Sequence, residues 1–153
     1  MKPVLIFCVL VIAGVLAFIR LAPSNPDIWH VDPQAAKKPR KPNAFILRPD
    51  SEKHPSPEFA MTAGALAQAF DDLALSDAGV SRLAGTPEEL WVTYIARSRV
   101  MGYPDYISVR FLELGQNRST LAVYSRARFG YRDFGVNRSR VLGWIRRIVD
   151  SVD

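Results

Sequence analysis

The chain has 153 residues, enough for one domain, and its formal net charge of +5 reflects 20 Lys and Arg against 15 Asp and Glu. Its single cysteine, Cys8, lies in an apolar N-terminal run. This excludes an intramolecular disulfide, and it excludes a thiolate metal site or a cysteine nucleophile in the folded domain.

The N-terminal residues Pro3 to Ile19 are uncharged and almost wholly apolar. As a helix they would span about 26 Å, close to the hydrocarbon core of about 30 Å. Arg20 can extend its charge to the interface and so lengthen the span. We therefore predict a retained transmembrane anchor at residues 1–22. The alternative is a cleaved signal peptide, with Lys2 as its basic region and Val15-Leu16-Ala17 as its cleavage motif.

The charges that flank this run conflict about membrane orientation. Lys2 precedes the span, as in a signal anchor whose C-terminal part is exported, whereas the basic run at residues 37–41 follows it, where positive charge keeps a flank inside. The basic run is distant and the short N-terminal region is typical of export. We expect a single-pass protein of a bacterial inner membrane and favour a periplasmic over a cytoplasmic domain.

Residues 23–57 hold eight of the eleven prolines. Proline lacks a backbone donor and is disfavoured inside helices, so the segment is predicted to be an extended tether. Two parts of it are less polar than the rest. Trp29 could rest at the membrane interface, and Phe45 to Leu47 could dock on the domain.

Residues 58–153 are expected to form one domain that folds without metals or disulfides. A helix is predicted to begin at Ser56-Pro57-Glu58 and to run to about Asp72, because capping residues precede apolar positions at three- and four-residue spacing. A second helix is predicted over residues 136–149, with four apolar residues buried: Val141, Trp144, Ile145 and Ile148.

Between these helices the sequence predicts strands near residues 80–84, 90–97, 105–114 and 120–129. The last two form a hairpin around residues 115–119. Keeping apolar residues on one face pairs Phe111 with Val123, Val109 with Ser125 and Ile107 with Ala127. The expected fold is α+β: an N-terminal transmembrane helix, then a three- to four-stranded antiparallel sheet with two helices on one face.

Arginine dominates the second half of the chain. Between Arg97 and Arg147 there are eleven arginines, no lysine and three acidic residues. The planar guanidinium suits carboxylates and phosphates, which favours an anion-binding surface. The alternative is an ordinary solvated face in an arginine-preferring genome.

The densest group of arginines connects the last strand to the last helix, at residues 125–140. Asp133 is placed to cap the helix or to pair with a neighbouring arginine, and the helix amides could bind an anion. The alternative is that this segment only locks the corner between strand and helix. The candidate binding residues are Arg126, Arg128, Tyr131, Asp133, Asn137 and Arg138.

The segment from Arg126 to Arg140 closely resembles the C-terminal signature of the bacterial and plastid domain of unknown function 1499 family, which is similar to S-R-x-G-Y-S-D-x-G-V-N-R-x-R. Residues 97–105 resemble the middle region of that family. The resemblance implies no reaction and no ligand, although many relatives have an N-terminal membrane or export segment. Relatives often carry an Asn-Cys pair where this chain has Asn43 and Ala44, so a role for that cysteine cannot apply here.

Standard catalytic motifs are missing from the sequence. There is no Gly-x-Ser-x-Gly elbow and no phosphate-binding loop, and both histidines, His30 and His54, precede the predicted core. A catalytic triad or a histidine metal site is therefore not expected there, and neither is a cofactor.

Three functional hypotheses follow. The leading one is a membrane-tethered, non-catalytic binding or scaffold domain, whose arginine face contacts an anionic lipid, a cell-wall polymer or an acidic protein. The second is an enzyme of unknown type that uses Asp105, Tyr131 and Asp133 together with arginines around the Gly130–Gly135 loop. The third is nucleic-acid binding by a cytoplasmic domain, with Tyr106 and Tyr124 interleaved with arginines on the sheet. Because we favour export, we expect no nucleic-acid partner.

Overall fold

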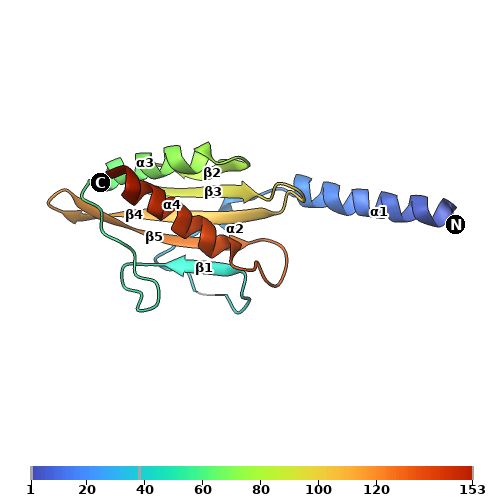
Figure 1. The fold of residues 1–153 in the computed structure, drawn as a ribbon, viewed down its shortest axis with the longest axis horizontal. Helices are drawn as coiled ribbons and strands as arrows, with labels where there is room; N and C mark the ends of the chain where they lie inside the picture. The colour runs from blue at the N-terminus through green and yellow to red at the C-terminus, as the bar shows by residue number, and fades with distance from the viewer. Residues whose placement is uncertain (1, 38, 153) are drawn as a thin grey trace.

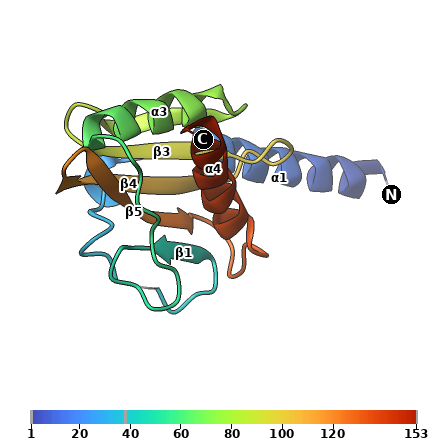
Figure 2. The same ribbon diagram turned by 60° about the vertical axis from the view of Figure 1, so that its left-hand side comes forward.

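The computed structural model describes residues 2–37 and 39–152, and it shows a long N-terminal helix followed by an α+β domain (Figure 1). Helix α1 (Lys2–Leu21) projects from one end of the domain. Helices α3 (Ala63–Ser76) and α4 (Val136–Val152) lie on one face of a sheet, as both Figure 1 and Figure 2 show. The predicted fold class is confirmed.

The sheet has five strands in the order β1-β5-β4-β3-β2, and all neighbours are antiparallel. Four of the strands match predicted ones. The bounds are β1 Ala44–Leu47, β2 Val80–Thr86, β3 Trp91–Arg97, β4 Pro104–Gly115 and β5 Arg118–Ala127. The fifth strand, β1, comes from the segment that the sequence assigned to the tether, and it pairs with β5 at one edge of the sheet.

The β4–β5 hairpin has a different register from the predicted one. Phe111 pairs with Leu121, Val109 with Val123 and Ile107 with Ser125, so each β4 residue faces a partner two positions earlier than expected. The turn is shorter than predicted because Gln116 and Asn117, both at positive φ, close a tight connection. Since side chains alternate with a period of two, this shift leaves every residue on its predicted face.

The first domain helix also begins later than predicted. Helix α3 starts at Ala63, where the hydroxyl of Thr62 accepts a hydrogen bond from the Ala65 amide (3.2 Å). Phe59 lies outside the helix and forms an isolated bridge with Ser119. Helix α4 starts at the predicted residue, and its four predicted core residues are buried.

The hydrophobic core lies between the two helices and the sheet, and Phe70 is at its centre. Its ring is 5.5 Å from that of Trp144, 5.6 Å from Phe111 and 6.0 Å from Tyr94. The contacts with Trp144 and Phe111 are edge-to-face, a geometry that stabilises a core beyond the area that the rings bury.

The opposite face of the sheet is covered by the segment that follows α1. This segment includes the short helix α2 (Pro26–Trp29). The Trp29 ring stacks on Tyr106 at 3.9 Å, and the His30 ring stacks on Trp91 at 3.9 Å. Trp29, expected at the membrane interface, thus packs against the domain, and this part of the predicted tether is structured.

Within the described residues, α1 is the one helix that is long and apolar enough to cross a membrane by length and composition. An N-terminal signal sequence has the same properties, so the helix is compatible with either.

Candidate functional site

The corner between β5 and α4 is organised by Asp133 and Asn137. The Asp133 carboxylate accepts hydrogen bonds from the backbone amides of Gly135 (3.2 Å) and Asn137 (3.0 Å), and from the Asn137 side-chain amide (2.8 Å). Burial alone would raise the pKa of Asp133, but these hydrogen bonds outweigh it and lower the pKa. Asp133 therefore caps α4, and its carboxylate occupies the position where the sequence suggested a bound anion.

Asn137 is fully buried and connects three parts of the chain. Its side-chain oxygen bonds the Ser125 hydroxyl, and its amide reaches the Asn43 carbonyl oxygen (3.4 Å). Asn43 also donates to the Gly130 carbonyl (3.0 Å). Asp133 and Asn137 therefore lock the corner between strand and helix, which is the structural alternative for this segment.

Asp105 pairs with Arg140 across 2.9 Å, and Arg140 also donates to the Asn137 side-chain oxygen (3.3 Å). Burial raises the pKa of Asp105, although Arg140 opposes the shift. The carboxylates of the enzyme hypothesis are thus both engaged in structural contacts. Tyr131 is 63% exposed and takes no part in this network among the described residues.

Arg126 and Arg128 project from the other face of the sheet. Arg126 is buried and donates to the Trp29 carbonyl oxygen (2.5 Å) and the Ser108 hydroxyl (3.3 Å). Burial lowers its pKa to about 10, which leaves it charged at neutral pH. Arg128 donates to the Pro23 carbonyl (2.9 Å) and the Tyr106 hydroxyl (3.2 Å). Both arginines hold residues 22–29 on the sheet.

The predicted stacking surface for nucleic acid is covered in the same way. Tyr106 is fully buried beneath Trp29, and the Arg126 guanidinium lies 4.4 Å from the centroid of the Tyr124 ring. These aromatic and cationic groups contact one another, so the chain itself occupies the surface that bases would need.

Arg138 lies apart from these contacts, on the rim of a groove beside β1. The groove has a volume of about 710 Å³ and runs past Ala44, Phe45 and Ile46, between the loop that precedes β1 and the loop that follows it. Asp133 and Gly135 contribute to its wall. Of the six predicted binding residues, the structure brings only Asp133 and Arg138 to this groove.

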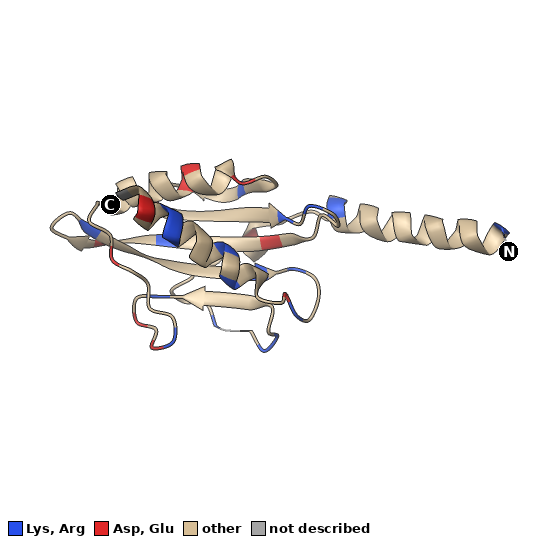
Figure 3. Ribbon diagram, viewed as in Figure 1, with Lys and Arg blue, Asp and Glu red and all other residues tan. Residues whose placement is uncertain are grey.

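The charged residues of the groove are mostly basic. Five basic side chains line it (Arg40, Lys41, Arg48, Lys53 and Arg138), together with three acidic ones (Asp50, Glu52 and Asp133). Arg48 is engaged by the Pro33 and Ala36 carbonyls. Among the described residues the other four basic side chains form no ion pair. Figure 3 shows basic and acidic positions on the loops that flank β1.

The groove could not be predicted from the sequence, because residues 44–47 were expected to belong to the tether. The one available signal was the apolar triplet Phe45-Ile46-Leu47 within a proline-rich stretch. Three residues are too few to establish a strand by periodicity. No group of three potential metal-ligating side chains is present within residues 2–37 and 39–152.

The chain was compared with models of known protein families. A family model described as "Protein of unknown function (DUF1499)" matches residues 34–148, which include β1, the groove and most of α4. No curated protein matches the chain.

Proposed function

We propose that this chain, which belongs to the DUF1499 family of proteins of unknown function, is a membrane-anchored binding protein. It holds an extended acidic polypeptide along the free edge of β1. The observation that carries the proposal is the basic groove of about 710 Å³ beside that edge. Anchoring is supported by α1, whose length and composition suit a membrane span.

Among the described residues, two positions of β1 have backbone hydrogen-bonding groups that face the groove side and take no partner. The Ala127 amide donates to the Asn43 carbonyl oxygen (2.9 Å), so Asn43 and every second residue after it bond to β5. The N–H and C=O groups of Ala44 and Ile46 therefore point away from β5. An extended peptide could add to the sheet there by main-chain hydrogen bonds.

The charge of the groove selects the kind of peptide. Arg40 and Lys41 precede β1, Lys53 lies in the loop that follows it, and Arg138 is at the start of α4. A strand laid along β1 would pass these side chains with alternate residues facing them. Acidic residues at those positions would be attracted, while basic residues would be repelled. The proposed partner is therefore an extended segment with alternating acidic residues.

The proposal can be tested with the full chain in uncharged detergent micelles and a fluorescent hexapeptide of alternating Glu and Val. Arg138→Glu should weaken binding about tenfold, equivalent to about 1.4 kcal/mol. Arg146→Glu is the matched control, because Arg146 is an exposed arginine of the same helix outside the groove. Equal affinities of the two variants would overturn the proposal, and so would equally tight binding of a Lys-Val hexapeptide.

A second pair of variants tests strand addition itself. Ile46→Pro removes an amide that points toward the groove and keeps the bonds to β5, whereas Ile46→Ala keeps the amide. Loss of one net hydrogen bond should weaken binding about threefold to tenfold in the proline variant relative to the alanine variant. If both variants bind equally, the peptide does not pair with β1.

A further inference from the structure

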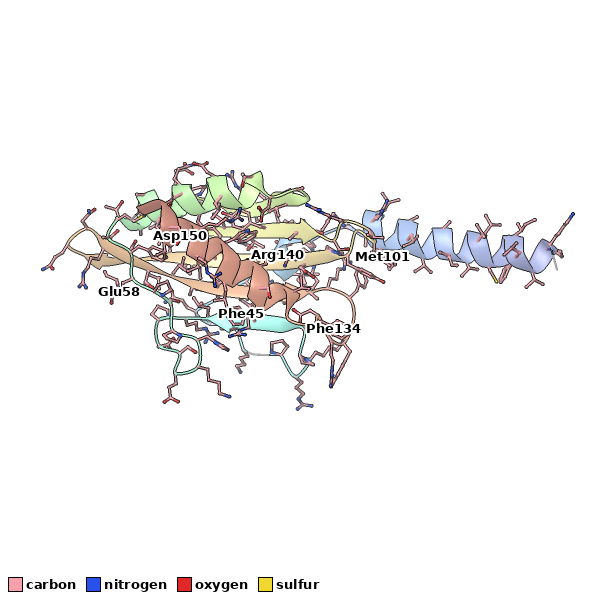
Figure 4. All side chains as sticks on the ribbon, in the orientation of Figure 1. Phe45, Glu58, Met101, Phe134, Arg140 and Asp150 are labelled. Atoms are coloured by element: carbon pink, nitrogen blue, oxygen red, sulfur yellow. The ribbon has the colours of Figure 1, made fainter. Side chains whose placement is uncertain are left out.

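We infer that the end of the domain from which α1 leaves is seated in the membrane interface, with the loops at residues 98–103 and 128–135 in contact with anionic lipid headgroups. This inference rests on the anchoring part of the proposed function and does not depend on what the groove binds, although Asp133 and Gly135 of the second loop also line the groove. Figure 4 labels Met101 and Phe134 at this end of the domain.

Contacts between α1 and these two loops fix the depth of the loops relative to the membrane. The Phe18 ring lies 6.4 Å from the Phe129 ring in an edge-on contact, and Arg20 donates to the Val100 carbonyl oxygen (2.7 Å). A 20-residue helix is about 30 Å long, which only just matches the hydrocarbon core. Phe18 must therefore lie within or at the edge of the apolar layer, and Phe129 and Val100 lie level with it.

The junction between α1 and the 98–103 loop is closely packed. Gly102 has a φ of +72°, and a Cβ on it would lie 2.7 Å from the Arg20 Cγ atom. The Arg97 guanidinium donates to the Gly102 carbonyl (3.1 Å), and the Ser98 amide donates to the Tyr103 carbonyl (3.0 Å). The loop is thus held against the end of α1, so its depth follows that of the helix.

Apolar side chains are exposed on both loops. Phe134 is 93% exposed and Val100 is 78% exposed, and Met101, Tyr103 and Tyr131 are also exposed. Phe134 also has a φ of +53°, which is unfavourable for a residue with a bulky side chain. In water this arrangement has no benefit, whereas at a membrane interface aromatic rings are favoured.

Basic side chains accompany the apolar ones. Arg99 and Arg132 are exposed on the same two loops, and Asp133, the acidic residue between positions 128 and 135, is occupied as the α4 cap. Arginine at the edge of a membrane can pair with lipid phosphates while its alkyl stem contacts apolar groups. The combination of exposed aromatic and arginine residues is what an anionic lipid surface recognises.

The experiment places an environment-sensitive fluorophore at single cysteines of the full chain in nanodiscs that contain phosphatidylglycerol. In a Cys8→Ser background, Phe134→Cys carries the reporter at the proposed seat. Asp150→Cys is the control, on an exposed α4 position that Figure 4 shows far from α1. Spin-labelled lipid should quench the reporter at position 134 at least threefold more strongly than at position 150, and aqueous iodide should give the opposite order.

The native Cys8, labelled in the unsubstituted chain, reports on the anchor separately. If lipid quenches the label at Cys8 but quenches positions 134 and 150 equally, the proposed contact of the two loops with the membrane is wrong, while α1 is still a membrane anchor. If iodide quenches the label at Cys8 freely, the anchor fails as well. A third comparison uses Val100→Cys with and without Arg99→Glu and Arg132→Glu. The charge reversals should reduce lipid quenching of that reporter, and no reduction would overturn the role of anionic headgroups.

Discussion

Arg126 holds Trp29 by two contacts, a hydrogen bond of 2.5 Å to its carbonyl oxygen and a guanidinium 5.3 Å from the centroid of its ring. The two residues are 97 positions apart in the chain. Trp29 in turn stacks on Tyr106, so this pair attaches the segment after α1 to the outer face of the sheet. An arginine that the sequence assigned to an anion-binding surface instead binds the protein's own backbone.

Replacing Arg126 by alanine should therefore lower the free energy of unfolding by about 2 to 3 kcal/mol, because the buried acceptors lose the charged donor that pairs with them. Arg126→Lys should also destabilise the protein, since an ammonium cannot reproduce the planar fork. Denaturant unfolding of the full chain in mild detergent measures both effects. Arg146→Ala, at an exposed position, should change the value by less than about 0.5 kcal/mol. Equal stabilities of the Arg126 and Arg146 variants would contradict this role.

The face that each strand residue occupies could be predicted from the sequence, whereas the pairing partners could not. The two-residue alternation places Phe111 and Val123 on the core side in any register that shifts by an even number. The actual register depends on the positive φ of Gln116 and Asn117, which the apolar pattern does not encode. The start of α3 was misplaced for a related reason, because Ser56 and Thr62 are both suitable caps and only the bridge of Phe59 to Ser119 decides between them.

The candidate site was less predictable than the fold. The corner at Asp133 and Asn137 follows from local spacing, since an Asx cap and a residue four positions later are sequence neighbours. The groove is formed by β1, the loops around it and α4, which meet only through tertiary pairing. The cover on the outer face depends on Trp29 contacting Tyr106, 77 positions later, and no local pattern specifies such a contact.

Two carboxylates should contribute to the acid limb of stability with opposite signs. The pKa of Asp133 is lowered in the folded protein, so its contribution is present above its ordinary value of 3.8 and is lost as the pH falls through the lowered value. The pKa of Asp105 is raised, so its ionised form costs stability, and this cost is relieved as the pH falls from the raised value toward 3.8. Asp133→Asn should therefore flatten the acid decline of the melting temperature, and Asp105→Asn should steepen it.

Calorimetric or fluorescence melting at a series of acidic pH values tests both signs. The slope of melting temperature against pH is compared between each variant and the unsubstituted chain, because removing either carboxylate also changes the absolute stability. If both variants had the same slope of melting temperature against pH as the unsubstituted chain, neither group would titrate differently in the folded and unfolded states.

Gly85 should tolerate no side chain. Its φ is +75°, and a Cβ on it would overlap the Trp91 carbonyl oxygen and lie 3.0 Å from the His30 ring. Gly85→Ala should therefore cost at least about 2 kcal/mol, from the left-handed backbone together with displacement of β3. Gly143→Ala is the control: nothing lies within 4 Å of the Cβ that it adds, and it should be stabilising by up to about 1 kcal/mol in a helix. A Gly85→Ala variant with the same melting temperature as the unsubstituted chain would contradict the close approach of Gly85 to the Trp91 carbonyl oxygen.

Membrane orientation decides which partners can reach the groove. We expect the domain to be exported, because Lys2 precedes α1 while the basic run at residues 37–41 is separated from the span by α2, which is packed on the sheet. Alkaline phosphatase fused to the C-terminus should then be active, and green fluorescent protein fused at the same position should be dark. The opposite pattern would place the basic run and the groove in the cytoplasm. The double variant Lys37→Glu, Lys41→Glu tests which charges set the orientation. If the basic run sets it, the double variant should invert the pattern of the two reporters. If Lys2 sets it, the reporter pattern should stay unchanged.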